Sequence, residues 1–81
     1  MGAVATSRPV SAAAGLFKRS VSLSGHRTSV ALEAEFWRAL EAIAAREGAT
    51  LSALIARIDL ERDQQRPLSS ALRVHALLNR S

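Results

Sequence analysis

The fold of this chain is decided by one short stretch, Arg27-Thr28-Ser29-Val30-Ala31-Leu32. Apolar and polar positions alternate along it. Thr28, Val30 and Leu32 form the more apolar set, and Arg27, Ser29 and Ala31 form the other set. A period of two is typical of a β-strand with one buried face and one exposed face. We therefore predict a strand here, with the even-numbered residues facing inward and the odd-numbered residues facing outward.

Two amphipathic helices are predicted directly after this strand. The first opens with the acidic residues of Glu33-Ala34-Glu35, which suit the N-terminal end of a helix dipole, and Gly48 is the expected left-handed stop. Thr50 is a suitable N-cap for the second helix, which we expect to run to about Arg62. Both helices carry apolar residues at helical spacing, namely Phe36, Trp37, Leu40, Ile43 and Ala44 in the first and Leu51, Leu54, Ile55 and Ile58 in the second.

One short strand cannot close a core with two helices unless it pairs with another strand. The chain has 81 residues and no cysteine, so disulfides are excluded, and a chain of this size commonly needs oligomerisation to be stable. We expect the strand to pair with the same strand of a second copy.

These segments resemble the ribbon-helix-helix family of DNA-binding domains. The resemblance lies in the run from Arg27 to Trp37 and in Gly48-Ala49-Thr50-Leu51-Ser52-Ala53-Leu54-Ile55, and it covers about residues 19–78. It is closest to the bacterial subgroup with a His-Arg-Thr-Ser strand and a Glu-Phe-Trp helix start. The family implies a mostly α fold with one short β-strand, in which two chains form a dimer through an antiparallel intersubunit β-ribbon that enters the major groove of DNA. The dimer core is then expected to contain Val30, Leu32, Phe36, Trp37, Leu40, Leu54, Ile55 and Ile58.

The N-terminal segment divides into two parts. Residues 1–17 show no sustained period, so we predict a disordered tail there and a ribbon-helix-helix domain over residues 18–81. Within 18–24 the chain alternates again, with Val21 and Leu23 on one side and serines on the other. This stretch is either the first strand of a hairpin or an arm that lies along DNA, and we favour the arm or a loosely held edge strand.

A third helix is predicted over 68–79, after Pro67. Leu68, Ala71, Leu72, His75 and Leu78 share one face of that helix. The ribbon-helix-helix subgroup carries a similar Leu-Ser-Ser-Ala-Leu-Arg segment, so the resemblance includes this added C-terminal helix. We expect the helix to pack on the dimer or to extend its interface.

The positive charge is concentrated near the start of the chain. The net charge is +4 at pH 7, and residues 1–27 hold four basic side chains and no acid, whereas the seven arginines and seven acids of 28–81 cancel. A basic segment that leads into a strand favours a polyanionic partner, of which nucleic acid is the usual one. The alternative is a tail that only improves solubility.

The candidate DNA-binding residues follow from these patterns. Arg27 can bond the O6 and N7 atoms of guanine together, Ser29 can donate or accept a hydrogen bond, and Ala31 can only touch a thymine methyl group. Ala31 departs from the polar or basic residue that is usual in the family. The free N–H groups of the second helix suit a phosphate, and the resemblance implies a clamp there. The full candidate set is Arg27, Ser29, Ala31, Thr50, Ser52, Lys18, Arg19 and His26. The alternative for Arg27 is a solvated side chain or an ion pair with Glu33 or Glu35.

Other classes of function find no support in the sequence. Two histidines without cysteine make no zinc site, and no catalytic constellation is visible, so we expect neither a cofactor nor an enzyme. The leading hypothesis is a homodimeric transcriptional repressor of the bacterial cytoplasm and nucleoid that binds double-stranded DNA, with no membrane span. The alternative is an antitoxin-like module that binds another protein through its tail and its third helix.

Overall fold

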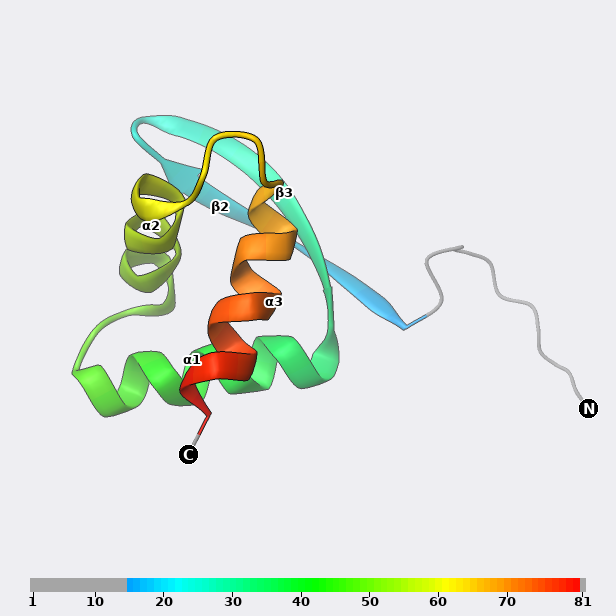
Figure 1. The fold of residues 1–81 in the computed structure, drawn as a ribbon, viewed down its shortest axis with the longest axis vertical. Coiled ribbons are helices and arrows are strands. Elements are labelled where there is room, and N and C mark those ends of the chain that lie inside the picture. Colours follow the sequence, from blue (N-terminus) through cyan, green and yellow to red (C-terminus); the bar gives the residue numbers. More distant parts are fainter. Residues whose placement is uncertain (1–14, 81) are drawn as a thin grey trace, which may run out of the picture.

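The computed structural model describes residues 15–80, which form a β-hairpin followed by three helices (Figure 1). Strands β2 (Leu16–Leu23) and β3 (His26–Glu33) lead into helices α1 (Ala34–Glu47), α2 (Leu51–Glu61) and α3 (Leu68–Asn79). The hairpin forms one layer and the helices form the other. The tail predicted for 1–17 lies mainly outside the described residues, and β2 begins within its last two positions, at Leu16.

The prediction of one strand is wrong, because the chain supplies two. β2 and β3 pair antiparallel within the same chain, in a register that sets Ser20 opposite Ser29. The residues between the strands, Ser24 and Gly25, both have positive φ angles of 51° and 82°. Two such residues are the signature of the tight turn whose twist matches a β-hairpin. The hairpin is therefore the correct alternative for residues 18–24, and β2 and β3 form a ribbon within one chain. Pairing between two copies stays a prediction.

The turn also explains why the buried residues change from odd to even numbers. Val21 is buried on β2, whereas Val30 and Leu32 are buried on β3. A loop of two residues places Leu23 and His26 opposite each other, so odd residues of one strand share a face with even residues of the other. Thr28 shares that inward face but is exposed, contrary to our expectation, although its cross-strand partner Val21 is buried.

The hydrophobic core lies between the inward face of the hairpin and the three helices. Leu32, Leu40, Ile55 and Leu72 are fully buried and come from four different elements. Eight residues were predicted for a dimer core, and Phe36 is the one that is only partly buried in this single chain. The seven buried residues are Val30, Leu32, Trp37, Leu40, Leu54, Ile55 and Ile58. Burial in one chain leaves their role in a dimer as a prediction.

The connection between α1 and α2 has the predicted caps. Gly48 has a φ of 70°, and the N–H groups of Gly48 and Ala49 donate to the carbonyls of Ala45 and Ala44, which ends α1 in a left-handed turn. Thr50 then caps α2, because its Oγ1 accepts from the N–H of Ala53 at 3.0 Å. These caps fix where one helix stops and the next starts.

Helix α3 has the predicted bounds and completes the core of its own chain. It packs against α1, α2 and β3 through Ala71, Leu72 and Ala76, which are buried. Leu78, which the sequence places on the same helical face as Leu68 and Leu72, is 74% exposed in the single chain. The buried face is centred on Leu72 and Ala76, one turn apart, which turns Leu78 outward. Among residues 15–80 no helix is both long and apolar enough to cross a membrane.

Candidate nucleic-acid interface

The outward face of the hairpin carries a polar and basic set of side chains. The register places Lys18 opposite Ala31, Ser20 opposite Ser29, and Ser22 opposite Arg27. Alternate residues of a strand point to opposite faces, and the residues between these are the ones that point toward the helices. All of this outward set is exposed except Ala31, which is half-buried. We call these residues, Lys18, Ser20, Ser22, Arg27, Ser29 and Ala31, the outward ribbon face.

Arg27 is held across this face by a serine of the other strand. Its Nε and Nη2 atoms donate to the Oγ of Ser20 at 3.2 Å and 3.0 Å. Among the described residues Arg27 forms no ion pair, so the predicted alternative of a bridge to Glu33 or Glu35 is not what the structure shows. Glu33 instead accepts from Nε of Arg73 at 3.0 Å. The full charge of Arg27 therefore remains available to an anion.

Glu33 stands at the boundary between the hairpin and α1. Its own backbone N–H and the guanidinium of Arg73 lower the pKa of its carboxyl group below the ordinary value. The carboxylate is thus ionised at neutral pH and is engaged by Arg73 at the end of the ribbon, away from Arg27. No acidic side chain belongs to the outward ribbon face between Lys18 and Ala31.

Arg19 lies on the opposite face from Lys18. It is paired with Val30 on the inward side, where its Nη1 atom is 2.9 Å from Oε2 of Glu41 and its guanidinium lies 4.7 Å from the ring centroid of Trp37. The indole N–H of Trp37 donates to the carbonyl of Phe17 at 2.8 Å. These contacts tie β2 to α1, so the structure does not bring Arg19 together with the other candidate DNA-binding residues.

The remaining candidates lie away from the centre of the ribbon. His26 follows the turn and is exposed, but its partner Leu23 places it on the inward side. Thr50 and Ser52 are exposed at the start of α2, whose first turn contains no acidic residue. No hydrogen bond or ion pair within 15–80 joins these two side chains to the hairpin. The start of α2 is open to an anion but is separate from the outward ribbon face.

Sequence reasoning missed Ser20 and Ser22 as members of this surface. The signal was present, because 18–24 alternates with serines on the side opposite Val21 and Leu23. Without the pairing to β3, those serines had no assigned neighbour. Lys18 was proposed as part of an arm, whereas the structure places it in a regular strand beside Ala31.

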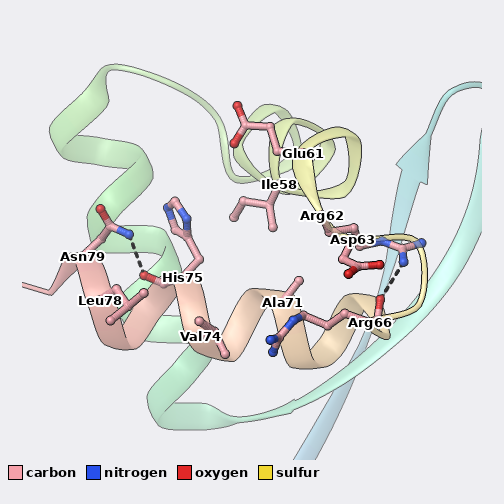
Figure 2. Close-up of a pocket in the computed structure, with 10 residues that line it drawn as sticks. All are labelled: Ile58, Glu61, Arg62, Asp63, Arg66, Ala71, Val74, His75, Leu78 and Asn79. Atoms are coloured by element: carbon pink, nitrogen blue, oxygen red, sulfur yellow. Dashed lines mark hydrogen bonds between the residues drawn. The ribbon is translucent and has the colours of Figure 1, made fainter.

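A shallow cavity of about 250 Å³ lies elsewhere, between α2 and α3 (Figure 2). Ile58, Ala71 and Val74 contribute apolar walls, and the buried Nε2 atom of His75 has no hydrogen-bond partner among the described residues. The side chains of Arg62 and Asn79 near it bond to backbone carbonyls of Arg66 and His75. No residue of the outward ribbon face lines this cavity, and the described residues contain no cluster arranged for a metal ion.

Comparison with known proteins identifies the fold. A family model for the ribbon-helix-helix domain matches residues 16–79, which include both strands and all three helices. No curated protein and no solved structure matches the chain. A two-stranded ribbon that precedes the helices, with a glycine stop and a capped second helix between them, agrees with this match. The chain belongs to the ribbon-helix-helix family of DNA-binding domains.

Proposed function

We propose that this protein is a homodimeric transcriptional regulator, acting as a repressor, that places the outward ribbon face in the major groove of DNA. The observation that carries the proposal is the exposed surface of Lys18, Arg27 and three serines with no acid among them. A two-stranded ribbon has the width that the major groove admits, about 12 Å. Membership of the ribbon-helix-helix family supports the same target.

Each side chain of this surface has a role that follows from its chemistry. Arg27 reads guanine through paired hydrogen bonds, Ser29 adds a weaker contact to a base edge, and Ala31 leaves room for a thymine methyl group. Lys18 neutralises a phosphate and contributes to the salt dependence of binding. Thr50 and Ser52 present the N-terminus of α2 to a second phosphate, which the helix dipole favours.

The two remaining candidates lie on the inward side of the hairpin, outside this surface. His26, beside the turn, adds at most a contact to the DNA backbone, whereas Arg19 packs β2 on α1. We therefore rank Arg27 and Lys18 first among the basic residues. The proposed regulator has no catalytic step and works at the bacterial nucleoid.

Dimerisation serves specificity in this proposal. The ribbon of one chain carries a single guanidinium on its outward face, which can discriminate only a few base pairs. Two copies that read two half-sites multiply that discrimination, as in other dimeric DNA-binding proteins. Because each ribbon is complete within one chain, the second copy adds a second reading surface.

The test is selection of bound duplexes from a random DNA pool, followed by titration of variants on the selected site. Arg27→Ala should weaken specific binding by about 1–3 kcal/mol. Arg38→Ala is the matched control, because Arg38 is an exposed arginine on α1 and its loss removes the same charge. Equal affinities of Arg27→Ala and the wild type on every selected duplex would contradict the proposal. Sedimentation of the free and bound protein measures whether two copies occupy one site.

A protein-interaction role is the second candidate, and one observation favours it. Helix α3 exposes Val74, Leu77 and Leu78 at spacing i, i+3, i+4, with exposed fractions of 38%, 56% and 74%. Contiguous exposed aliphatic residues are typical of protein interfaces. If a foreign protein binds there, Leu77→Ser with Leu78→Ser should abolish its stoichiometric co-purification and leave DNA binding unchanged. Loss of the dimer in the same variant would assign the surface to a second copy instead.

A further inference from the structure

We propose that Ser20 is a positioning residue that holds Arg27 in the orientation needed to read a base. This inference rests on the proposed entry of the hairpin into the major groove. Its structural basis is a forked contact: both Nε and Nη2 of Arg27 donate to the same hydroxyl oxygen, at 3.2 Å and 3.0 Å. Both residues are exposed, so the contact is made on the surface that DNA would meet.

The direction of this contact places the guanidinium over the middle of the ribbon. Arg27 is directly opposite Ser22, yet its hydrogen bonds run diagonally to Ser20, the partner of Ser29. Diagonal neighbours on one face of an antiparallel pair lie within reach of a long side chain. The arginine therefore leans away from the turn at Ser24 and toward the centre of the outward ribbon face.

The contact leaves the base-reading edge of the guanidinium free. A guanidinium has five N–H donors in a planar fork, and Ser20 engages one on Nε and one on Nη2. The two donors on Nη1 and the second donor on Nη2 remain, and they form the end of the side chain. Paired donors of this kind match the O6 and N7 acceptors of guanine. Ser20 thus occupies the edge of the guanidinium formed by Nε and Nη2, and the edge formed by Nη1 and Nη2 is left to the DNA.

A serine at position 20 is better suited to orienting Arg27 for DNA than an acidic residue would be. An aspartate or glutamate at the same place would hold Arg27 more strongly, but it would also cancel the charge and repel phosphates. The neutral hydroxyl restricts the rotamers of Arg27 and keeps its positive charge. Restricting a side chain before binding reduces the entropy lost when the complex forms.

This role predicts a separation between specificity and general affinity. Removal of the Ser20 hydroxyl leaves the number of positive charges unchanged, so the slope of log K against log salt should also stay unchanged. The discrimination between guanine and another base depends on the orientation of the fork and should fall. A serine with a merely structural role would not alter that discrimination.

The experiment compares four variants of the full chain, Ser20→Ala, Ser20→Thr, Ser22→Ala and Arg27→Ala, on two duplexes. These are the selected site and the same site with its contacted guanine pair replaced by an adenine pair. Ser20→Ala should reduce the ratio of the two affinities about 2- to 10-fold, the loss expected for one hydrogen bond. Ser22→Ala is the matched control, since Ser22 is exposed on the same face and makes no hydrogen bond to Arg27 among the described residues. Ser20→Thr retains the hydroxyl and should restore the ratio.

The outcomes separate this inference from the proposed function. If Arg27→Ala loses discrimination while Ser20→Ala retains it fully, the positioning role is wrong and the DNA-reading role of Arg27 stands. If Ser22→Ala has the same effect as Ser20→Ala, a general change of the ribbon surface explains the result, and the inference is overturned. If Arg27→Ala does not alter discrimination, the proposed reader is wrong and the role of Ser20 falls with it.

Discussion

The two faces of the β2–β3 hairpin are built from alternate residues of the same strands and have separate tasks. The inward face contributes Val21, Val30 and Leu32 to the core, whereas the outward ribbon face presents Arg27 and Lys18 to solvent. Because side chains of a strand alternate, adjacent positions can be selected for stability and for binding independently. This chain therefore separates its hydrophobic core from its exposed basic surface at the level of single residues.

Arg19 and Arg27 show the same division with one residue type. Arg19 lies against Trp37 and pairs with Glu41, and both contacts belong to the interior side of the hairpin. Arg27 lies on the other side and contacts only the neutral hydroxyl of Ser20 among its described hydrogen-bond partners. The basic charge of the N-terminal part of the chain is therefore not one surface, although it is continuous in the sequence.

The largest expected effect tests the inward face. Leu32→Ala should lower the free energy of unfolding by about 2–5 kcal/mol, because Leu32 is fully buried between the hairpin and the helices. Urea denaturation followed by circular dichroism measures the change. Ser29→Ala, on the outward ribbon face, should stay within about 0.5 kcal/mol of the wild type. Equal losses in the two variants would break the distinction between the faces.

The next effect tests the turn that sets which residues face inward. Gly25→Ala should cost about 1–2 kcal/mol, because Gly25 has a φ of 82° and a Cβ there is strained even though no atom lies within 4 Å of it. Thermal or urea unfolding measures the loss. Ser24→Gly serves as the contrast, since it relieves rather than adds strain at a φ of 51°. An unchanged stability for Gly25→Ala would argue against this turn.

A paired experiment on β2 sharpens the comparison between neighbouring basic residues. Arg19→Ala should lower the free energy of unfolding by about 1 kcal/mol through the loss of its contacts with Glu41 and Trp37. Lys18→Ala should leave stability unchanged and reduce the salt slope of DNA binding by ~0.9, the value for one phosphate contact. Urea unfolding and salt-dependent titrations give both quantities for both variants. The reverse assignment would contradict the register of the hairpin.

The smallest effect concerns Glu33, where the hairpin meets α1. Its pKa is lowered in the folded protein by its own backbone N–H and by Arg73, so it stabilises the fold at neutral pH, and this contribution is lost as the pH falls through the lowered pKa. The difference in unfolding free energy between wild type and Glu33→Gln should therefore shrink on acidification from roughly pH 6 to pH 3. A difference that is constant with pH would show that the carboxylate charge is not involved.

Local signals in the sequence were sufficient for the helices. Gly48 and Thr50 marked the end of α1 and the start of α2, and the bounds predicted for α3 agree with Leu68–Asn79. Each of these features depends on residues within one or two helical turns of each other. The exact set of buried residues on α3 does not follow from local spacing, because packing against α1 and α2 buries Ala76 and leaves Leu78 exposed.

The pairing of the strands could not be predicted with the same ease. Ser24-Gly25 is a weaker turn signal than Asn-Gly, and the switch from odd to even apolar residues across it is the sequence feature that indicates a two-residue turn. For the candidate site, alternation alone predicted that Arg27 and Ser29 face outward, and both are exposed. The contact with Ser20 depends on pairing and on a side-chain rotamer, neither of which a linear pattern contains.

The closure of the hairpin inside one polypeptide has a consequence for how the ribbon depends on protein concentration. A ribbon shared between two molecules exists only above the concentration at which they associate, whereas this ribbon is present in every folded copy. A newly made chain therefore carries its complete outward ribbon face even when few copies are present. Under the proposed function, a low protein concentration limits how many DNA sites are occupied, but the surface itself is present in each folded chain.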